Sequence, residues 1–246
     1  MDNRKTVLIT GASGDIGQSL CQGFKDLGWT VIATDRNRIQ SIKADHFIEM
    51  DLDLICNNDI YFIDKIKSIK KLISGELTTL INNAALQIVK PAKEIALQDW
   101  QKSLNINLTA PFILSMKLLD ELKAAKGSII NISSIHAKLT KPNFSAYSAS
   151  KAGLSGLTKS LAVEIGDSVR VNSISPAAIN TQMLKKSFTD NLSGLNKLKD
   201  YHPSKIIGTT TDVLDAAIYL ANGDKFVNGM EIRLDGGISS RLHDPN

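Results

Sequence analysis

Short apolar runs rich in Val, Ile and Thr alternate along the chain with longer segments in which apolar residues recur every three or four positions. The short runs predict strands and the longer segments predict helices. Strands are expected at residues 6–10, 30–35, 46–51, 77–84, 127–134, 169–176 and 230–237. Helices are expected at residues 15–28, 58–75, 99–124, 146–165 and 211–221. Residues 185–208 are polar and weakly periodic, which predicts a mobile lid or a small helical insertion.

The alternation of strand and helix predicts a single doubly wound α/β domain of the Rossmann type over residues 1–246. Its seven-stranded sheet is expected to be mostly parallel, with helices on both faces. The strands are apolar along their whole length, as strands buried on both faces are. Because such sheets bind ligands beyond the carboxyl ends of their strands, the functional residues are sought in the segments that follow the strands.

The composition is that of an ordinary globular protein and narrows the choice of partners. Apolar residues make up 43% of the 246 residues, charged residues make up 22%, and the net charge of +4 comes from scattered basic residues. Without a basic stripe no nucleic-acid partner is expected, and no apolar run reaches the length of a membrane span. Cys21 and Cys56 form no CxxC pair. We expect free thiols, no signal peptide before the first strand, and a cytoplasmic protein.

Three glycines, Gly11, Gly14 and Gly17, fall between the first predicted strand and the first predicted helix. A turn at this place has to bend sharply, approach a ligand and pack a helix on the sheet, and each task favours a residue without Cβ. The helix that follows directs its free N–H groups and the positive end of its dipole at the turn. The segment predicts a pyrophosphate site, with a purely structural tight turn as the alternative.

Asp35 ends the second predicted strand, where a carboxylate binds the ribose hydroxyls of an adenosine. The same negative charge repels a 2′-phosphate, so Asp35 favours NAD over NADP. Arg36 is able to attract a 2′-phosphate, and Asp15 occupies a place in the turn where NADP-binding proteins often carry a basic residue. We predict NAD as the cofactor and keep NADP as the alternative.

The sequence YSASK places Tyr147 and Lys151 on one face of a predicted helix, and Ser134 ends the fifth predicted strand. Reduction of a carbonyl by a nicotinamide needs a proton donor, and a free tyrosine with a pKa of about 10 is a poor acid–base group at neutral pH. A lysine ammonium about 4 Å away stabilises the phenolate and lowers its pKa, while desolvation opposes this. We expect Tyr147 to titrate nearer neutrality, Lys151 to tune it and Ser134 to hold the substrate oxygen.

A lone YxxxK motif is often surface decoration, but here the glycine turn, Asp35, NNAA, NISS and YxxxK follow one another in order. With these motifs the chain resembles the short-chain dehydrogenase/reductase family over residues 7–237. The resemblance implies that Ser134 and Tyr147 are catalytic and that Lys151 also binds the nicotinamide ribose. It further implies that Asn107, in the segment DWQKSLNINLTAPF, organises a proton-relay water.

The resemblance extends to the cofactor contacts. The segment MDLD resembles the stretch that places an aspartate, here Asp51, on the adenine amino group, and SPAAINTQML resembles the segment that contacts the nicotinamide carboxamide through Ile179 and Thr181. The predicted cofactor-binding residues are Gly11, Ser13, Asp15, Ile16, Gly17, Asp35, Arg36, Asp51, Leu52, Asn83, Ala84, Ala85, Tyr147, Lys151, Pro176, Ala177, Ile179 and Thr181. Glycines of the family pattern are replaced at Asp15, Ala85 and Ala177.

These residues predict an oxidoreductase that transfers a hydride between a nicotinamide cofactor and a carbonyl or secondary alcohol. The alternatives are an epimerase or dehydratase of the sugar-nucleotide type, which tends to be longer, and a protein that senses NADH without turnover. The resemblance also implies a homo-oligomer, a dimer or a tetramer, formed through the helices at residues 99–124 and 146–165. A sugar, a hydroxy acid, a steroid-like ketone and an acyl thioester all stay open as the substrate. Candidates to select among them are Gln87, His136, Met183 and Leu184.

Overall fold

The sheet that the alternation predicts is present, and it is parallel throughout. The computed structural model describes residues 4–186, 188 and 192–242. Its seven strands lie in the order β3-β2-β1-β4-β5-β6-β7, and all neighbours are parallel. The strands are β1 (Thr6–Thr10), β2 (Thr30–Asp35), β3 (His46–Glu49), β4 (Thr79–Asn82), β5 (Ser128–Ile132), β6 (Arg170–Pro176) and β7 (Glu231–Leu234). The strand order reverses between β1 and β4, which is the switch point of a doubly wound sheet.

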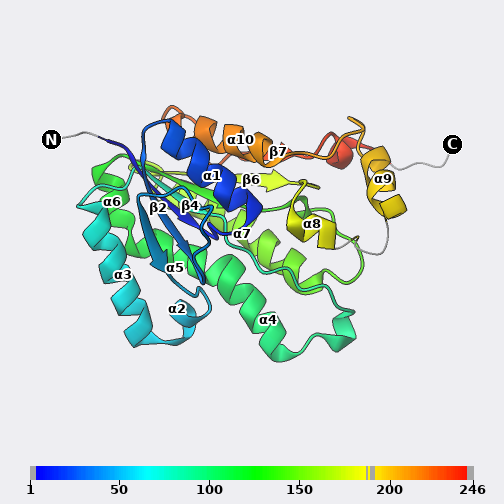
Figure 1. Cartoon of the computed structure of the whole chain (residues 1–246), viewed down its shortest axis with the longest axis horizontal. Helices are drawn as coiled ribbons and strands as arrows, with labels where there is room; N and C mark the ends of the chain where they lie inside the picture. The colour runs from blue at the N-terminus through cyan, green and yellow to red at the C-terminus, as the bar shows by residue number, and fades with distance from the viewer. Residues whose placement is uncertain (1–3, 187, 189–191, 243–246) are drawn as a thin grey trace.

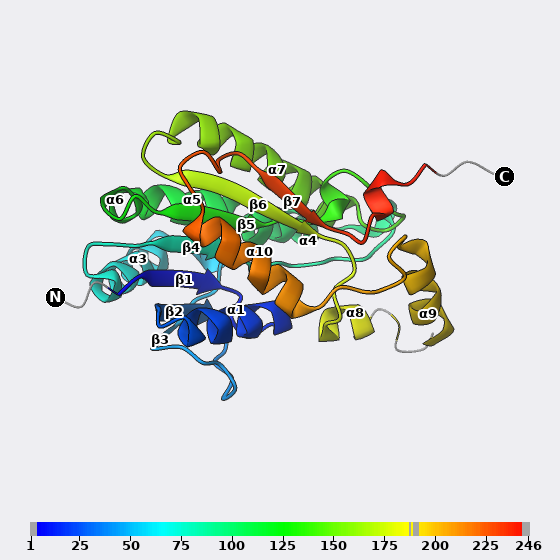
Figure 2. The same cartoon turned by 90° about the horizontal axis from the view of Figure 1, so that it is seen from above.

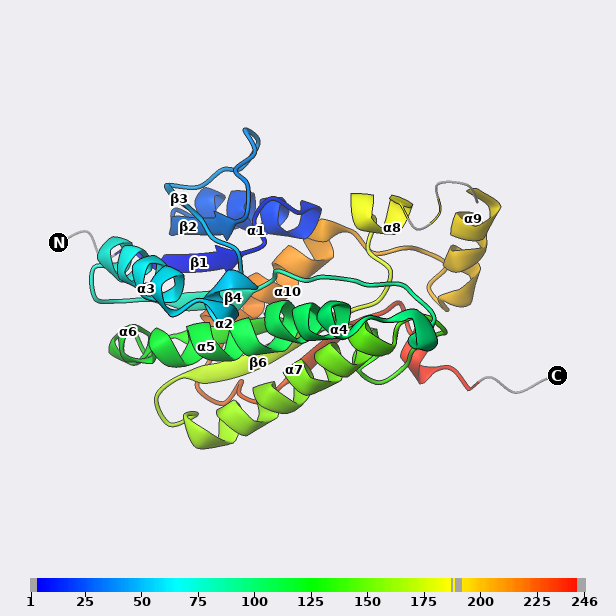
Figure 3. The same cartoon turned by 90° about the horizontal axis from the view of Figure 1, so that it is seen from below.

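Helices cover both faces of this sheet (Figure 1). On one face lie α1 (Asp15–Asp26) and α10 (Thr210–Asn222) (Figure 2). On the other lie α3 (Asp59–Ile73), α5 (Ala110–Lys117) and α7 (Ser145–Glu164) (Figure 3). The remaining helices are α2 (Leu54–Asn57), α4 (Leu97–Leu104), α6 (Leu119–Ala124), α8 (Gln182–Lys186) and α9 (Leu192–Tyr201). Within the part of the chain that the structure describes, no helix is long and apolar enough to cross a membrane.

Alternate side chains of the central strands enter two hydrophobic clusters, one on each side of the sheet. In β1, Leu8 packs with residues of α3, α5 and α7, whereas Val7 and Ile9 pack with residues of α1 and α10. All three side chains are fully buried. Burial on both faces removes the polar positions that an exposed face would require. This explains why the strands read as continuous apolar runs.

The segment predicted as one helix at residues 99–124 is divided into three. α4 ends at Leu104, a π-helical turn follows at Asn105–Thr109, and α5 and α6 meet at Leu118. A π turn inserts one residue into the helical hydrogen-bond pattern and is frequent at functional positions. Hydrophobic periodicity does not show such an insertion, because an apolar face continues on both sides of it.

The last strand ends earlier than expected, and the segment predicted as a lid or a small helical insertion contains a helix. β7 ends at Leu234, because Gly236 and Gly237 have φ angles of 56° and 86° that belong to a turn. The predicted lid at residues 185–208 contains α9, and α8 begins just before it. Residues 187 and 189–191 of that predicted lid lie outside the described residues.

Candidate functional site

A cavity of about 1230 Å³ lies at the carboxyl ends of the strands. Its walls come from the segments after β1, β2, β4, β5 and β6 and from the chain around α8 and α9. Ser134 and every residue of the predicted cofactor-binding set, from Gly11 to Thr181, line this cavity, whereas Asn107 does not. Residues that are scattered over the sequence therefore meet at the edge of the sheet where a doubly wound fold binds its ligand.

The glycine turn fits tightly against the segment that follows β4. Gly11 has a φ angle of +66°, and a Cβ built on it would lie 2.6 Å from the Cα of Ala84. A Cβ on Gly17 would lie 2.1 Å from the carbonyl oxygen of Gly11. The N-cap of α1 is Gly14, which has no side chain to cap the helix, so the N–H groups of the first turn are left for an anion. The turn therefore fits the pyrophosphate of a dinucleotide.

Asp15, which replaces a glycine of the family pattern, makes a contact that a glycine has no side chain to make. Its carboxylate accepts a hydrogen bond from the backbone N–H of Gln182, with 2.5 Å between the nitrogen and Oδ2. Gln182 is the first residue of α8. Asp15 thus joins the glycine turn to the helix that leads into the predicted lid.

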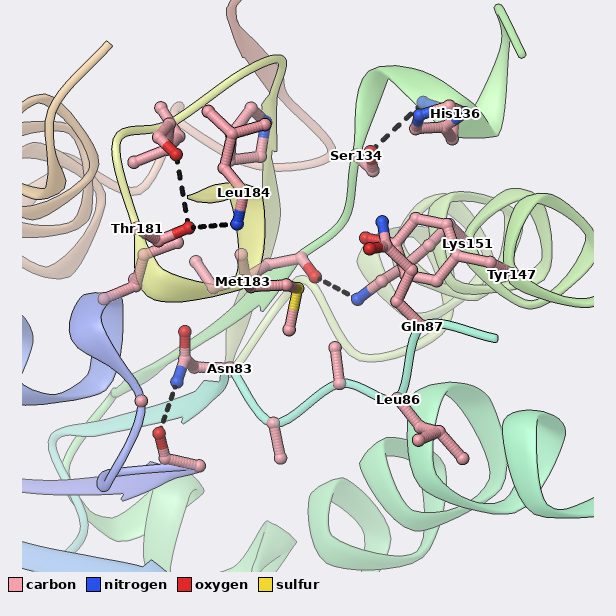
Figure 4. Close-up of a pocket in the computed structure, with 18 of the residues that line it drawn as sticks. Asn83, Leu86, Gln87, Ser134, His136, Tyr147, Lys151, Thr181, Met183 and Leu184 are labelled. Carbon is pink, nitrogen blue, oxygen red and sulfur yellow. Dashed lines mark hydrogen bonds between the residues drawn. The ribbon is translucent and has the colours of Figure 1, made fainter. Parts of the chain in front are cut away.

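Two polar side chains next to the turn fix its position. Oδ2 of Asp35 accepts a hydrogen bond from the backbone N–H of Ser13 at 2.9 Å. Nδ2 of Asn83 donates to the carbonyl oxygens of Thr10 and Gly11 at 2.9 and 3.0 Å (Figure 4). These contacts hold the ends of β1, β2 and β4 together, on the two sides of the switch point.

The outer parts of the predicted cofactor site are also organised by local hydrogen bonds. Oδ1 of Asp51 accepts from the backbone N–H of Asp53 at 2.8 Å. On the opposite wall, the Thr181 hydroxyl donates to the carbonyl of Ile179 and accepts from the N–H of Leu184, both at 3.2 Å (Figure 4). These bonds orient the two segments that the family resemblance assigns to the adenine and to the nicotinamide.

Ser134, Tyr147 and Lys151 meet on one wall of the cavity (Figure 4). Tyr147 and Lys151 lie one turn apart on α7, with Lys151 Nζ 5.8 Å from the centroid of the Tyr147 ring. Ser134 follows β5; its hydroxyl accepts a hydrogen bond from the N–H of His136 at 3.2 Å and lies near enough to the Tyr147 phenol to lower the pKa of that phenol. The hydroxyl of the preceding residue, Ser133, instead lies 2.8 Å from that of Ser155. Ser134 is therefore the serine of the NISS motif whose hydroxyl lies next to Tyr147.

Burial controls the protonation of Tyr147 and Lys151. Lys151 Nζ donates to the carbonyl of Ile132 at 2.7 Å, and desolvation lowers the pKa of Lys151 to about 7. Desolvation also raises the pKa of Tyr147 above its ordinary value, and the nearby Ser134 hydroxyl offsets only part of this rise. The expectation that Tyr147 titrates nearer neutrality is therefore wrong here. Loss of water around the phenol outweighs the stabilisation of the phenolate by the Ser134 hydroxyl.

Asn107 lies in the π-helical turn, and its fully buried amide joins two parts of the site. Its Oδ1 accepts from the N–H of Leu86 at 2.7 Å, and its Nδ2 donates to the Leu86 carbonyl and to the Ser150 hydroxyl, both at 2.9 Å. Ser150 lies on α7 between Tyr147 and Lys151 and donates to the Tyr147 carbonyl at 2.7 Å. Asn107 therefore fixes α7 to the segment after β4, and its role toward a relay water stays a prediction.

Some residues of the cavity have no signal in the local sequence. Gln87, His136, Met183 and Leu184, which the sequence suggests as substrate contacts, do line it. So do Lys102 on α4, Lys141 in the loop before α7 and Arg241 after β7. Lysine and arginine at these places look like ordinary surface residues in the sequence. Only the fold shows that three distant segments bring them to the same cavity.

Comparisons with known proteins agree with this site. Residues 5–192 match the family model described as short chain dehydrogenase. The chain belongs to the short-chain dehydrogenase family. It is 30% identical over 250 residues to 3beta-hydroxysteroid dehydrogenase 1 of Eggerthella lenta, covering 96% of this chain and 94% of that protein.

Two solved structures with a bound nicotinamide cofactor are similar to this chain over nearly its whole length. 4-Hydroxyisoleucine dehydrogenase complexed with NADH has a TM-score of 0.85 and 29% identity, with 97% of this chain and 100% of that one covered. ElxO with NADP bound has a TM-score of 0.84 and 29% identity, with the same shares covered, 97% and 100%. Because one neighbour holds NADH and the other NADP, they do not choose between the two cofactors.

This short-chain dehydrogenase is an NAD(P)-dependent oxidoreductase that acts on a hydroxyl group or the corresponding carbonyl. The prediction of hydride transfer between a nicotinamide cofactor and a carbonyl or secondary alcohol is confirmed. The comparisons do not favour an epimerase, a dehydratase or a protein that only senses NADH.

Proposed function

We propose that Tyr147 exchanges the proton of the reaction, that Ser134 holds the substrate oxygen and that Lys151 tunes Tyr147. The observation that carries this assignment is that Ser134, Tyr147 and Lys151 all line the same cavity as the predicted cofactor-binding residues. Two hydroxyls at one point offer a substrate oxygen two hydrogen bonds, which orient the substrate and stabilise negative charge on that oxygen.

The nicotinamide ring, when bound, supplies the hydride in reduction and accepts it in oxidation. As the carbonyl carbon is reduced, the Tyr147 hydroxyl gives its proton to the substrate oxygen while Ser134 donates a hydrogen bond to it. The raised pKa of Tyr147 keeps the phenol protonated at neutral pH, as a proton donor requires. A protonated Lys151 stabilises the phenolate that is left, and this charge is present at pH values below its pKa of about 7.

We assign the parts of the cofactor to the walls of the cavity in the order of the sheet. The glycine turn holds the pyrophosphate, Asp35 holds the adenosine ribose, and Asp51 and Leu52 hold the adenine. Ile179 and Thr181 would hold the nicotinamide end, in the same cavity as Ser134 and Tyr147. The support for this order is that all these residues line one continuous cavity.

We propose NAD as the preferred cofactor. The Asp35 carboxylate is held at the end of β2 by the N–H groups of Ser13 and Arg36, at 2.9 and 2.7 Å. A carboxylate fixed there accepts hydrogen bonds from two ribose hydroxyls and repels a 2′-phosphate. The Arg36 side chain is exposed and able to turn away from the cavity.

The test of this preference is a comparison of kcat/KM for NADH and NADPH with a common ketone. We expect the wild type to prefer NADH by roughly 100-fold in kcat/KM, which corresponds to about 2.8 kcal/mol. In Asp35→Ser this preference is expected to fall at least tenfold, by about 1.4 kcal/mol or more. Asp26→Ser removes a carboxylate from the exposed end of α1 and serves as the matched control. An unchanged NADH preference in Asp35→Ser would show that another residue distinguishes the ribose hydroxyl of NADH from the 2′-phosphate of NADPH.

We propose that the enzyme is a homo-oligomer, a tetramer or a dimer. Large apolar side chains are exposed on the helices expected to form the interface, among them Phe112 on α5 (45% exposed) and Val163 on α7 (89% exposed). Burying them against a second copy removes them from water. Size-exclusion chromatography with light scattering is expected to give at least twice the chain mass of 26.7 kDa. A single species of chain mass would contradict this proposal.

We further propose that residues 1–246 act as one domain with a lid near residues 185–208, and that the enzyme is cytoplasmic. The contact of Asp15 with Gln182 supports a lid that is coupled to the cofactor turn. Cys21 and Cys56 are free thiols, which suits a reducing compartment.

A further inference from the structure

The part of the cavity outside the cofactor-binding set carries an excess of positive charge. Lys102, Lys141 and Arg241 line it, and Asp99 is the acidic side chain found beside them in the described lining. Asp99 is already neutralised by Lys90, with 2.6 Å between Nζ and Oδ2. Three cations thus face this space without a free carboxylate among them.

The three cations differ in their surroundings. Lys102 is half-buried on α4. Among the described residues, neither Lys102 nor Arg241 has an acidic partner within ion-pair distance. Lys141 Nζ lies 4.9 Å from the centroid of the Phe144 ring, and the His136 ring stacks on Phe144 with 4.5 Å between the centroids.

His136, which also lines the cavity, adds no charge to it. Burial and the charge of Lys141 lower the pKa of His136 to about 4, so that its ring is neutral at physiological pH. His136 therefore supplies neither a cation nor an anion to the cavity. A low-dielectric space lined by charges of one sign concentrates a ligand of the opposite sign.

Apolar side chains outside the cofactor-binding set line the same cavity. They are Leu139, Phe144, Met183, Leu184, Leu198 and Ile238. They come from the loop after β5, from the chain around α8 and α9, and from the segment after β7, which lies at the same end of the molecule as α9 (Figure 1). A small and wholly polar substrate leaves these surfaces in water, whereas a substrate with a hydrocarbon portion covers them.

We propose that the substrate is a ketone or secondary alcohol with a hydrocarbon portion and an anionic group, a carboxylate or a phosphate, which Lys102, Lys141 and Arg241 bind. This inference rests on the function proposed above, because it takes Ser134 and Tyr147 as the residues that hold the reacting oxygen. The anionic group fixes the other end of the molecule. Charge thereby selects the substrate, and uncharged ketones of the same size react more slowly.

The first test compares three ketones of similar length with saturating NADH: 5-oxohexanoate, its amide 5-oxohexanamide, and 4-oxopentyl phosphate. We expect kcat/KM for at least one anionic ketone to exceed that for the amide by about tenfold or more, the gain from one charge-assisted hydrogen bond. The acid and the phosphate ester show which anion the cations prefer. Added salt is expected to reduce the advantage of the anionic ketone over the amide.

Variants locate the anion site. Lys102→Met and Arg241→Gln are each expected to reduce the ratio of kcat/KM for the anionic ketone to that for the amide by about tenfold. Lys93→Met removes one exposed positive charge that does not line the cavity and is expected to leave this ratio unchanged. Use of a ratio within each variant removes any common effect on folding or on cofactor binding.

The outcomes separate this inference from the proposed catalytic roles. Equal or faster turnover of the amide, still lost in Tyr147→Phe, would overturn the anion site and leave the catalytic assignment standing. If no ketone gave turnover that is lost in Tyr147→Phe, the result would count against the catalytic assignment. In that case a binding experiment tests the anion site. The rise in Tm of the NADH complex is measured with hexanoate, with pentyl phosphate and with hexanamide, and a larger rise with an anionic ligand than with hexanamide supports the site. Equal shifts with all three ligands would overturn it.

Discussion

Replacing Tyr147 with Phe is expected to lower kcat by roughly 10³-fold, the size of a lost proton transfer at the reacting oxygen. The variant keeps the aromatic ring, which packs edge-on against His136 and Phe144 at centroid distances of 5.8 and 6.2 Å. We therefore expect little change in Tm. Single-turnover absorbance of bound NADH with a saturating ketone measures the chemical step directly.

A matched control separates the loss of the phenol from a general effect of the substitution. Tyr219→Phe removes the hydroxyl of a half-exposed tyrosine on α10 and is expected to keep wild-type turnover. Titration of NADH by fluorescence is expected to give similar dissociation constants for Tyr147→Phe and the wild type. If Tyr147→Phe kept more than about a tenth of kcat, another group would have to donate the proton.

Several parts of the site can be predicted from the sequence because they depend on local geometry. The glycine turn is such a part, since Gly11 needs a positive φ angle and Gly17 leaves no room for a Cβ. The spacing of Tyr147 and Lys151 is another, because residues four apart on a helix share one face. The order of strands and helices likewise follows from periodicity, and the switch point between β1 and β4 then places these residues together.

Other parts cannot be predicted because they depend on contacts between distant segments. In the sequence, Asp15 is only a departure from the glycine motif. The structure shows that its carboxylate accepts a hydrogen bond from the N–H of Gln182, which is far away in the chain. The π-helical turn that carries Asn107 is hidden because it interrupts hydrogen bonds and not the apolar pattern.

The protonation of Tyr147 is equally beyond the sequence. It depends on desolvation, which raises the pKa of the phenol, and on the Ser134 hydroxyl, which lowers it, and only the degree of burial decides which of the two effects is larger. The YxxxK motif identifies Tyr147 and Lys151 but does not indicate how far each side chain is buried from water.

Lys151→Met is expected to remove most of the activity and also to change how stability depends on pH. Burial lowers the pKa of Lys151 from 10.5 to about 7. Between these values the unfolded chain holds a proton that the folded protein has released. The contribution of this group to the free energy of unfolding therefore rises with pH, by at most about 1.4 kcal/mol per pH unit, and the methionine variant lacks this rise.

Urea unfolding of both proteins at pH 7, 8 and 9 measures this difference. Cys21 and Cys56, whose pKa values burial raises to about 12, act in the opposite direction, because the unfolded thiols lose their protons first as the pH rises. Both cysteines are present in both proteins, so their effect cancels in the difference. We expect the wild type to gain stability relative to Lys151→Met across this range. A constant difference would mean that Lys151 stays charged in the folded protein, and that it then stabilises the Tyr147 phenolate across the whole neutral range and not only below pH 7.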